Sequence, residues 1–384
     1  MWIYLLLLLP PLLVAASGRL PARLRRFAWP LAWVALVLFV GLRRELAADW
    51  DNYLILFQRA GAYPLAEALT LSDPGYMLLS GLLARLGLAL PAVNLACAAI
   101  FATGLVKFAR AQPLPALAML IAVPVLVMLA ALMSTRQSAA LGLTMWALAS
   151  YQAGGRRLPA ALLLGALTFH WTAVLLLPAA IAVHARRVPP WLVAAAGGAA
   201  GVGLAAALLF VPDLADRVAH IAASLAAWPR AAPTLAALAL LFALWPRLGF
   251  DERERRLAAG LAAIALFALA LLPVLSAAGD RLGFYAVPLQ MMVFTRAVSR
   301  APRGAARRAA AAAVALFYVA MFVVWLAATP YRGCLTPYRS YLADPGALAD
   351  PTPDRHRRTL PCMTVAAGEA TASPSAGSPI PRTA

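Results

Sequence analysis

Residues 43–76 read RRELAADWDNYLILFQRAGAYPLAEALTLSDPGY, and they lie between apolar runs that are long enough to cross a lipid bilayer. This stretch contains five of the 15 acidic residues of the chain, although the chain is 63% hydrophobic and only 12% charged. Such a concentration of charge makes it a candidate for polar chemistry at a membrane surface. The alternative interpretation of the same composition is a solvated loop between two helices.

The rest of the chain has the composition of a helical membrane protein. A mean hydropathy of +0.80 and repeated apolar runs predict an all-α polytopic membrane protein with roughly 10–12 transmembrane or re-entrant helices. We expect residues 1–328 to form a single membrane domain, with 43–76 as its outer loop. Residues 329–364 are expected to pack on the outer face, and residues 365–384, which are rich in Pro, Ser and Ala, to be disordered.

The basic residues do not indicate nucleic-acid binding, although the net charge is +18. They occur as short clusters between apolar runs, which is typical of cytoplasmic loops in membrane proteins. Three cysteines, Cys97, Cys334 and Cys362, have no metal-ligand spacing, so we expect no metal and no cofactor. The sequence leaves open whether Cys334 pairs with Cys362.

The distribution of arginine predicts the topology. Arginine-rich segments at 19–26 and 247–256 are expected to be inside, which places 43–76 and the C-terminal tail outside. We therefore expect the polar candidates to gather at the outer face of the membrane. Seven ionisable or aromatic candidates then lie on that one face: Asp49, Asp73, Arg136, His170, Asp280, Arg281 and Tyr338.

Two apolar segments do not fit a simple crossing. Residues 75–90 are too short and contain an arginine, so a re-entrant or interfacial segment is expected there. Residues 158–184 have an arginine pair at each end, which favours a hairpin of two short helices with His170 at its outward tip. That tip would lie in an outward-open cavity. The number of helices in these two segments stays open.

Several charged residues have both a structural and a functional interpretation. Arg136 begins a helix after a long apolar run, so it either extends to the membrane interface or grips a phosphate. His170 is either a hydrogen-bonded packing residue or a functional group at membrane depth. Asp280 and Arg281 are either a local ion pair at a helix end or part of the same site.

The order of the motifs distinguishes these interpretations. Arg43 or Arg44 is followed by Asp49-Trp50-x-x-Tyr53 and by Asp73-Pro74-Gly75-Tyr76. Further along the chain come Arg136-Gln137, Phe169-His170, Arg281 with Tyr285, and Pro337-Tyr338-Arg339-Ser340. Over residues 40–342 this series resembles the EpsG/Wzy-like family of membrane polysaccharide polymerases. One departure is Ala47-Ala48, where the family often has Gly-Thr before the first aspartate.

The resemblance implies a GT-C-like helical bundle with one outward-facing cavity. It also implies a multi-pass protein of the bacterial inner membrane whose active face is periplasmic. It implies a metal-independent glycosyltransferase that polymerises oligosaccharide repeat units linked to polyprenyl diphosphate, giving an exopolysaccharide or an O-antigen-like polymer. The implied partners are the lipid-linked oligosaccharides, the lipid bilayer, and a chain-length regulator and a flippase of the same pathway. The sugars, their linkage and the inverting or retaining stereochemistry stay open, as does the oligomeric state.

The same resemblance assigns roles to residues. A glycosyl transfer of this kind needs a base for the acceptor hydroxyl and cations for the departing diphosphate. Asp49 and His170 are the two catalytic candidates, either of which would be the base. Arg136 and Arg281, with Arg43 or Arg44, are the candidates for the diphosphate. The other substrate-binding candidates are Tyr53, Asp73, Tyr76, Gln137, Asp280, Tyr285 and Tyr338.

Two other functions stay open at this point. One is a different lipid-sugar transferase, such as an O-antigen ligase or a GT-C enzyme that transfers single sugars. The other is a polysaccharide transporter or flippase, in which buried charges would line a path rather than a reaction site. The internal repeats that many transporters contain are not visible in this sequence.

Overall fold

The computed structural model describes residues 2–17, 22–46, 50–176, 180, 188–209, 228–273, 281–328, 335–344 and 346. All regular elements within these residues are helical, and the one β-type contact among them is an isolated antiparallel bridge between Arg43 and Ser340. The prediction of an all-α protein is therefore confirmed.

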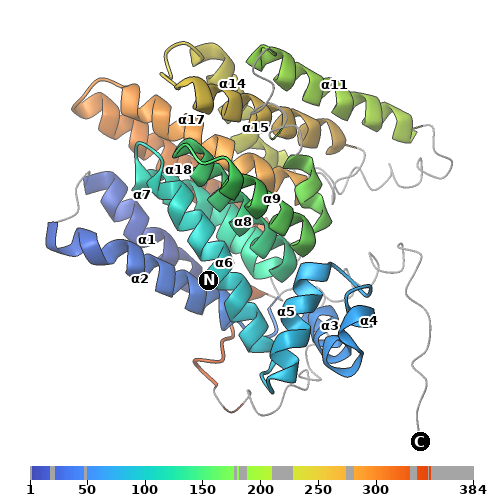
Figure 1. The fold of residues 1–384 in the computed structure, drawn as a ribbon. Coiled ribbons are helices and arrows are strands. Elements are labelled where there is room, and N and C mark those ends of the chain that lie inside the picture. The colour runs from blue at the N-terminus through green and yellow to red at the C-terminus, as the bar shows by residue number, and fades with distance from the viewer. Residues whose placement is uncertain are drawn as a thin grey trace, which may run out of the picture.

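The helices follow one another as the apolar runs predicted, in a layered bundle (Figure 1). The α-helices are α1 (Trp2–Ser17), α2 (Ala22–Gly41), α3 (Trp50–Ala62), α4 (Leu65–Ala68), α5 (Pro74–Arg85), α6 (Leu90–Arg110), α7 (Pro115–Ala122), α8 (Thr135–Gln152), α9 (Arg157–Phe169), α11 (Pro190–Leu209), α14 (Trp228–Leu244), α15 (Glu252–Leu271), α17 (Val287–Arg300) and α18 (Ala305–Ala328). The π-helix η1 (Val123–Ala131) and the 3₁₀ helices η2 (Trp171–Leu176) and η3 (Phe284–Ala286) complete the described elements.

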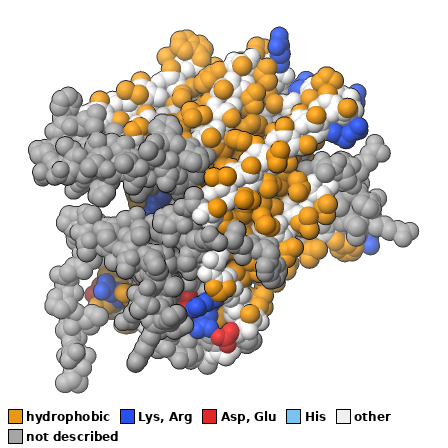
Figure 2. Space-filling model, turned by 180° about the vertical axis from the view of Figure 1, so that it is seen from behind, with side chains coloured by type: hydrophobic (Ala, Val, Ile, Leu, Met, Phe, Trp, Pro, Cys, Tyr) orange, Lys and Arg blue, Asp and Glu red, His pale blue; other side chains and the backbone are white. Residues whose placement is uncertain are grey.

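The helical surfaces are those of a membrane protein. Three of the described helices, at Leu90–Arg110, Pro190–Ala207 and Ala305–Ala327, are long and apolar enough to cross a bilayer. Shorter apolar helices include Arg26–Gly41 and Pro115–Ala131. Figure 2 shows a broad hydrophobic surface, with charged side chains mostly toward its ends. The predicted total of 10–12 transmembrane or re-entrant helices exceeds these three spans and stays a prediction.

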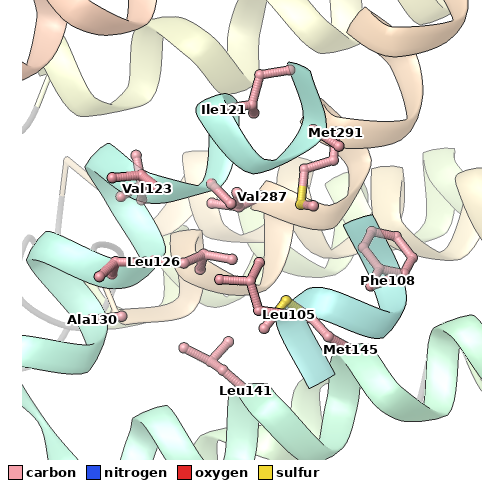
Figure 3. Close-up of a cluster of buried hydrophobic side chains, with 14 of the residues drawn as sticks. Leu105, Phe108, Ile121, Val123, Leu126, Ala130, Leu141, Met145, Val287 and Met291 are labelled. Carbon is pink, nitrogen blue, oxygen red and sulfur yellow. The ribbon is translucent and has the colours of Figure 1, made fainter. Parts of the chain in front are cut away.

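The core lies where α6, α7, η1, α8 and α17 meet, and its side chains are almost all aliphatic (Figure 3). The closest approach is between α6 and α8, because a Cβ atom on Gly104 would lie only 1.8 Å from the carbonyl oxygen of Gly142. Small residues allow this close helix packing inside a membrane, where burial of apolar surface provides no driving force between helices. The tight contact holds the middle of α8 against α6.

Residues 113–133 form one apolar run in the sequence. The helix in this run changes from an α-helix to a π-helix at Pro124. α7 continues into η1, a π-helix of nine residues that are all buried. Proline has no backbone N–H and its ring clashes with the carbonyl four residues earlier, so a regular α-helical hydrogen-bond pattern cannot pass through it. π-Helical segments are frequent beside functional sites. This one leads directly to Ser134 and to the first turn of α8.

The outer stretch is more ordered than the predicted loop. It contains α3 and α4, which group with α5 at one end of the bundle (Figure 1). The reason is visible in the sequence: Trp50, Tyr53, Leu54 and Ala60 recur at helical spacing, and all four are buried. The charged residues between these positions gave the stretch the composition of a loop.

α5 is only 12 residues long, about 18 Å at 1.5 Å per residue, so it is too short to cross a bilayer. This length agrees with the expected re-entrant or interfacial segment. The charged residue inside this apolar run is Arg85, and its contacts show why it is there. Its guanidinium donates hydrogen bonds to the carbonyls of Ala60 (3.1 Å), Tyr63 (2.7 Å) and Gly81 (2.8 Å), and thereby caps the ends of α3 and α5.

Residues 335–344 return to the end of α2, and we call them the C-terminal clasp. The backbone N–H of Tyr341 donates to Leu42 O (2.9 Å), and that of Arg44 donates to Arg339 O (3.0 Å). The Tyr338 ring stacks on Phe39 with ring centroids 4.6 Å apart. The clasp lies within the predicted tail 329–364, most of which, with all of 365–384, falls outside the described residues.

The predicted topology can be tested by cysteine labelling at Ala66 and Glu252, which are both exposed. In a variant whose three native cysteines are replaced, a membrane-impermeant reagent is expected to label Ala66→Cys in intact cells and to leave Glu252→Cys unlabelled. Permeabilised cells serve as the control, since both positions should then react. Labelling of Glu252→Cys in intact cells would contradict the topology.

Candidate functional site

The centre of the site is an ion pair between Arg136, at the start of α8, and Asp73, immediately before α5. Arg136 Nη1 lies 2.8 Å from Asp73 Oδ2 and donates to Ser72 Oγ at 2.6 Å. The two side chains retain 20% and 12% of their exposure, so solvent can reach the pair. The sequence named both residues as substrate-binding candidates, and the structure brings them together from positions 63 residues apart.

The motif Asp73-Pro74-Gly75 explains why Asp73 reaches this place. Pro74 begins α5, where its missing N–H costs nothing. A Cβ atom on Gly75 would lie 2.4 Å from Thr168 Oγ1, so glycine lets the start of α5 pack closely against the end of α9. Burial raises the pKa of the Asp73 carboxyl above its ordinary value, and the Arg136 guanidinium and a Trp171 backbone hydrogen bond offset only part of that rise.

His170 ends α9 with an extended backbone (φ −161°, ψ 127°), and its side chain is almost fully buried. The backbone N–H of Thr172 donates to Nδ1 at 3.2 Å, and Thr172 Oγ1 lies 2.7 Å from the same nitrogen. A backbone N–H can only donate, so Nδ1 is an acceptor and the proton of the neutral imidazole is on Nε2. His170 therefore offers a hydrogen-bond donor at Nε2. The predicted helix break at this residue is present.

Two of the predicted tyrosines lie beside Arg136. The Tyr53 ring centroid is 5.7 Å from Arg136 Cζ, and the Tyr53 hydroxyl is 3.2 Å from Ser134 Oγ. The Tyr76 ring packs edge-on against Tyr53 with centroids 5.7 Å apart. Both tyrosines are buried, so they form an aromatic floor under the guanidinium.

Gln137 and Tyr285 connect the start of α17 to the site. Gln137 Nε2 donates to the backbone carbonyl of Arg281 at 2.8 Å. The Tyr285 hydroxyl lies 3.2 Å from Thr172 Oγ1, the hydroxyl that contacts His170. The Arg281 side chain is exposed. These contacts hold the Arg281 segment beside His170.

Arg43 adds a second, fully buried cation. It is 3% exposed, and its guanidinium donates to Val40 O at 2.6 Å and to Thr135 Oγ1. No carboxylate pairs with it anywhere in the described parts of the chain. A buried cation without a counter-ion is costly, so this position favours an anion nearby. Thr135 directly precedes Arg136, so Arg43 contacts the residue next to Arg136 at the start of α8.

The remaining candidates lie elsewhere or fall outside the described residues. Arg44 forms ion pairs with Asp344 and Glu45, and Tyr338 donates to Phe39 O (2.6 Å), so both belong to the contact between α2 and the clasp. Asp49 and Asp280 lie outside the described residues. Their predicted roles stay predictions.

The sequence analysis missed four polar residues that hold the site together. They are Ser72, Asn94, Thr135 and Thr172. Asn94 and Thr135 had a usable signal, since polar residues inside or at the end of an apolar run are costly at membrane depth.

Among the described residues, no group of three or more His, Cys, Asp or Glu side chains lies close enough to hold a metal ion.

Comparison with known proteins addresses the family. Comparison with curated proteins and with solved structures gives no match. The EpsG family model matches residues 26–340, which include every described element from α3 through α18 and the first part of the clasp. Because this match covers most of the 384 residues, the chain belongs to the EpsG family.

Proposed function

We propose that this protein polymerises oligosaccharide repeat units linked to polyprenyl diphosphate, by metal-independent glycosyl transfer at the outer face of the bacterial inner membrane. Membership of the EpsG family supports a role in polysaccharide polymerisation. The bundle would be GT-C-like, with its cavity facing outward. A flippase would supply the lipid-linked units to this face, and a chain-length regulator would act on the product.

The observation that carries the proposal is the state of the Arg136 guanidinium. Nη1 makes both side-chain hydrogen bonds to Ser72 and Asp73, whereas Nε is buried and has no hydrogen-bond partner among the residues that the structure describes. A buried donor without a partner is costly and needs an explanation. Nε–H and Nη2–H form one edge of a guanidinium, and that edge matches two oxygens of a phosphate. A diphosphate oxygen at this edge would satisfy the buried donor.

The chemistry then follows from the charges. A hydroxyl oxygen of the acceptor unit attacks the anomeric carbon of the donor chain, and the bond from that carbon to the phosphate oxygen breaks. The diphosphate leaves with the electron pair, so negative charge grows beside Arg136, with Arg43 behind it. Preorganised cations at such a place stabilise the transition state more than the ground state. Arg281 would add a further positive charge at the rim.

His170 would act as a donor in this scheme. Its Nε2–H can hold a sugar hydroxyl or a phosphate oxygen, whereas Nδ1 is occupied by Thr172. Asp49 is the other residue that the sequence names as a candidate base for the acceptor hydroxyl. Tyr53, Tyr76 and Tyr285 would shape the floor and wall of the cavity.

The test is reconstitution of the purified protein in liposomes with lipid-linked repeat units from a deletion strain. We expect a ladder of polymers, and the same ladder in the presence of a metal chelator. In the deletion strain, single repeat units should accumulate on the carrier at the periplasmic face. Accumulation at the cytoplasmic face would indicate a flippase, and transfer of finished chains to another lipid would indicate a ligase.

The donor role of His170 predicts a difference between two amides. His170→Gln places an N–H near the position of Nε2, so it should retain partial activity and make shorter chains. His170→Asn places its amide near Nδ1 instead and should lose most polymer. The measurement is the ladder of chain lengths from both variants at matched expression. Equal and complete loss in the two variants would show that His170 acts as the base.

A further inference from the structure

A diphosphate at the Nε–Nη2 edge of Arg136 would compete for the positive charge of this guanidinium with a carboxylate that already lies at Nη1. Asp73 Oδ2 lies 2.8 Å from Nη1 of the same guanidinium. The diphosphate carries more negative charge than one carboxylate, and it can use two donors at once. Binding of the proposed substrate therefore raises the question of what the displaced carboxylate does next.

We propose that Asp73 is the counter-ion that the incoming diphosphate displaces from Arg136, and that the displaced carboxylate, in place of Asp49, accepts the proton of the acceptor hydroxyl. This inference rests on the proposed function, because it needs a diphosphate donor and a hydroxyl acceptor at this site.

The position of Asp73 in its helix supports an active role. Asp73 is the N-cap residue of α5, a position where aspartate normally accepts a hydrogen bond from the first turn and stabilises the helix. Here its side chain makes no such bond and turns to Arg136 instead. The helix therefore forgoes its cap, and the carboxylate lies at the start of α5 beside the Arg136 guanidinium. A carboxylate retained only to stabilise α5 would face the backbone.

The surroundings also suit a proton acceptor. Burial raises the pKa of the Asp73 carboxyl, and the Arg136 guanidinium is the largest of the effects that oppose this rise. When a diphosphate neutralises Arg136, that opposing effect weakens and the carboxylate becomes a stronger base. Substrate binding would thus activate the base at the moment when the leaving group is in place. Among the described residues, His170 cannot compete for this role through Nδ1, which Thr172 occupies.

The step balances in atoms and charge. The acceptor O–H bond breaks and its proton moves to Asp73, while the oxygen forms the new bond to the anomeric carbon. The bond between that carbon and the diphosphate oxygen breaks, and the electron pair leaves with the diphosphate. When the diphosphate departs, Arg136 regains Asp73 as its counter-ion. The proton is then released to water, because the restored ion pair favours the ionised carboxylate.

The experiment uses the full-length protein in liposomes and measures turnover and binding separately. Asp73→Asn should lower the turnover by roughly 10²–10⁴-fold, the range for loss of a general base. The same variant should bind polyprenyl diphosphate as tightly as the wild type or more tightly, because the competing charge is gone. Arg136→Gln should lose both. Asp73→Glu should restore part of the turnover.

The matched control is Glu252→Gln, which makes the same carboxylate-to-amide change in an exposed ion pair with Arg256 on α15. It should leave both measurements unchanged. The pH profile adds a further readout: the acid limb of wild-type turnover should lie above the pH expected for an ordinary aspartate, since the pKa of Asp73 is raised. Asp73→Asn should lack this limb.

Three results would overturn the proposal. Wild-type turnover in Asp73→Asn would show that the carboxylate is not the base, and loss of turnover in Asp49→Asn alone would assign the role to Asp49. Parallel loss of binding and turnover in Asp73→Asn would show that the residue only supports the fold. If the wild-type protein binds polyprenyl diphosphate but makes no polymer, the proposed function fails, while the binding comparison still decides the counter-ion exchange.

Discussion

Arg136→Lys is expected to lower polymer synthesis by roughly 10²–10³-fold, the usual loss when one preorganised donor to a developing anion is removed. Lysine keeps the positive charge but has one nitrogen, and it cannot hold Ser72, Asp73 and a phosphate in the geometry of a planar fork. The variant should still insert into the membrane. Turnover per molecule, measured in liposomes at matched protein content, tests this expectation.

A suitable control is Arg59→Lys on α3, in the same outer group of helices. The Arg59 side chain is exposed. It should keep the wild-type ladder. If Arg136→Lys also keeps the wild-type chain length, charge alone is enough at this position. Arg136 would then be an arginine that extends to the membrane interface, and the diphosphate would have to bind elsewhere.

Most of the helices could be predicted from the sequence because most apolar runs correspond to one helix. The break at His170 was also predictable, since arginine pairs at both ends of one apolar run cannot lie on opposite sides of the membrane under the charge rule. The sequence did not indicate that residues 123–131 would form a π-helix. Pro124 indicated only that a regular α-helix would be interrupted there. The outer stretch was misjudged because its charges outnumber the four buried positions that make α3 amphipathic.

The candidate site could be predicted as a set of residues but not as a set of contacts. The order of the motifs named Asp73, Arg136 and His170. The structure places all three near the C-terminal end of α9. Their pairing depends on the approach of Gly75 to Thr168, a contact between residues 93 positions apart that no local pattern encodes. The tautomer of His170 follows from Thr172, which the motif does not include.

The second large effect concerns the C-terminal clasp. A chain that ends after Gly346 should retain polymer synthesis, whereas a chain that ends after Ala328 should lose it by an order of magnitude or more. Without the clasp, buried Glu45 loses its ion pair with Arg339, and Leu42 O loses its bond from Tyr341. Removing a hydrogen-bond partner from a buried polar group costs roughly 1–3 kcal/mol, and Glu45 keeps its ion pair with Arg44.

This loss should act on the site through Arg43. The backbone on both sides of Arg43 is held by the clasp, and its guanidinium contacts Thr135, the residue before Arg136. Tyr338→Ala is the milder variant, because it keeps the chain and removes the ring that stacks on Phe39. In both variants we expect turnover per inserted molecule to fall. The amount of protein in the membrane should fall by a smaller factor. If turnover per molecule stays at the wild-type value, α2 and Thr135 alone hold Arg43, and the clasp contributes only to the stability of the outer face.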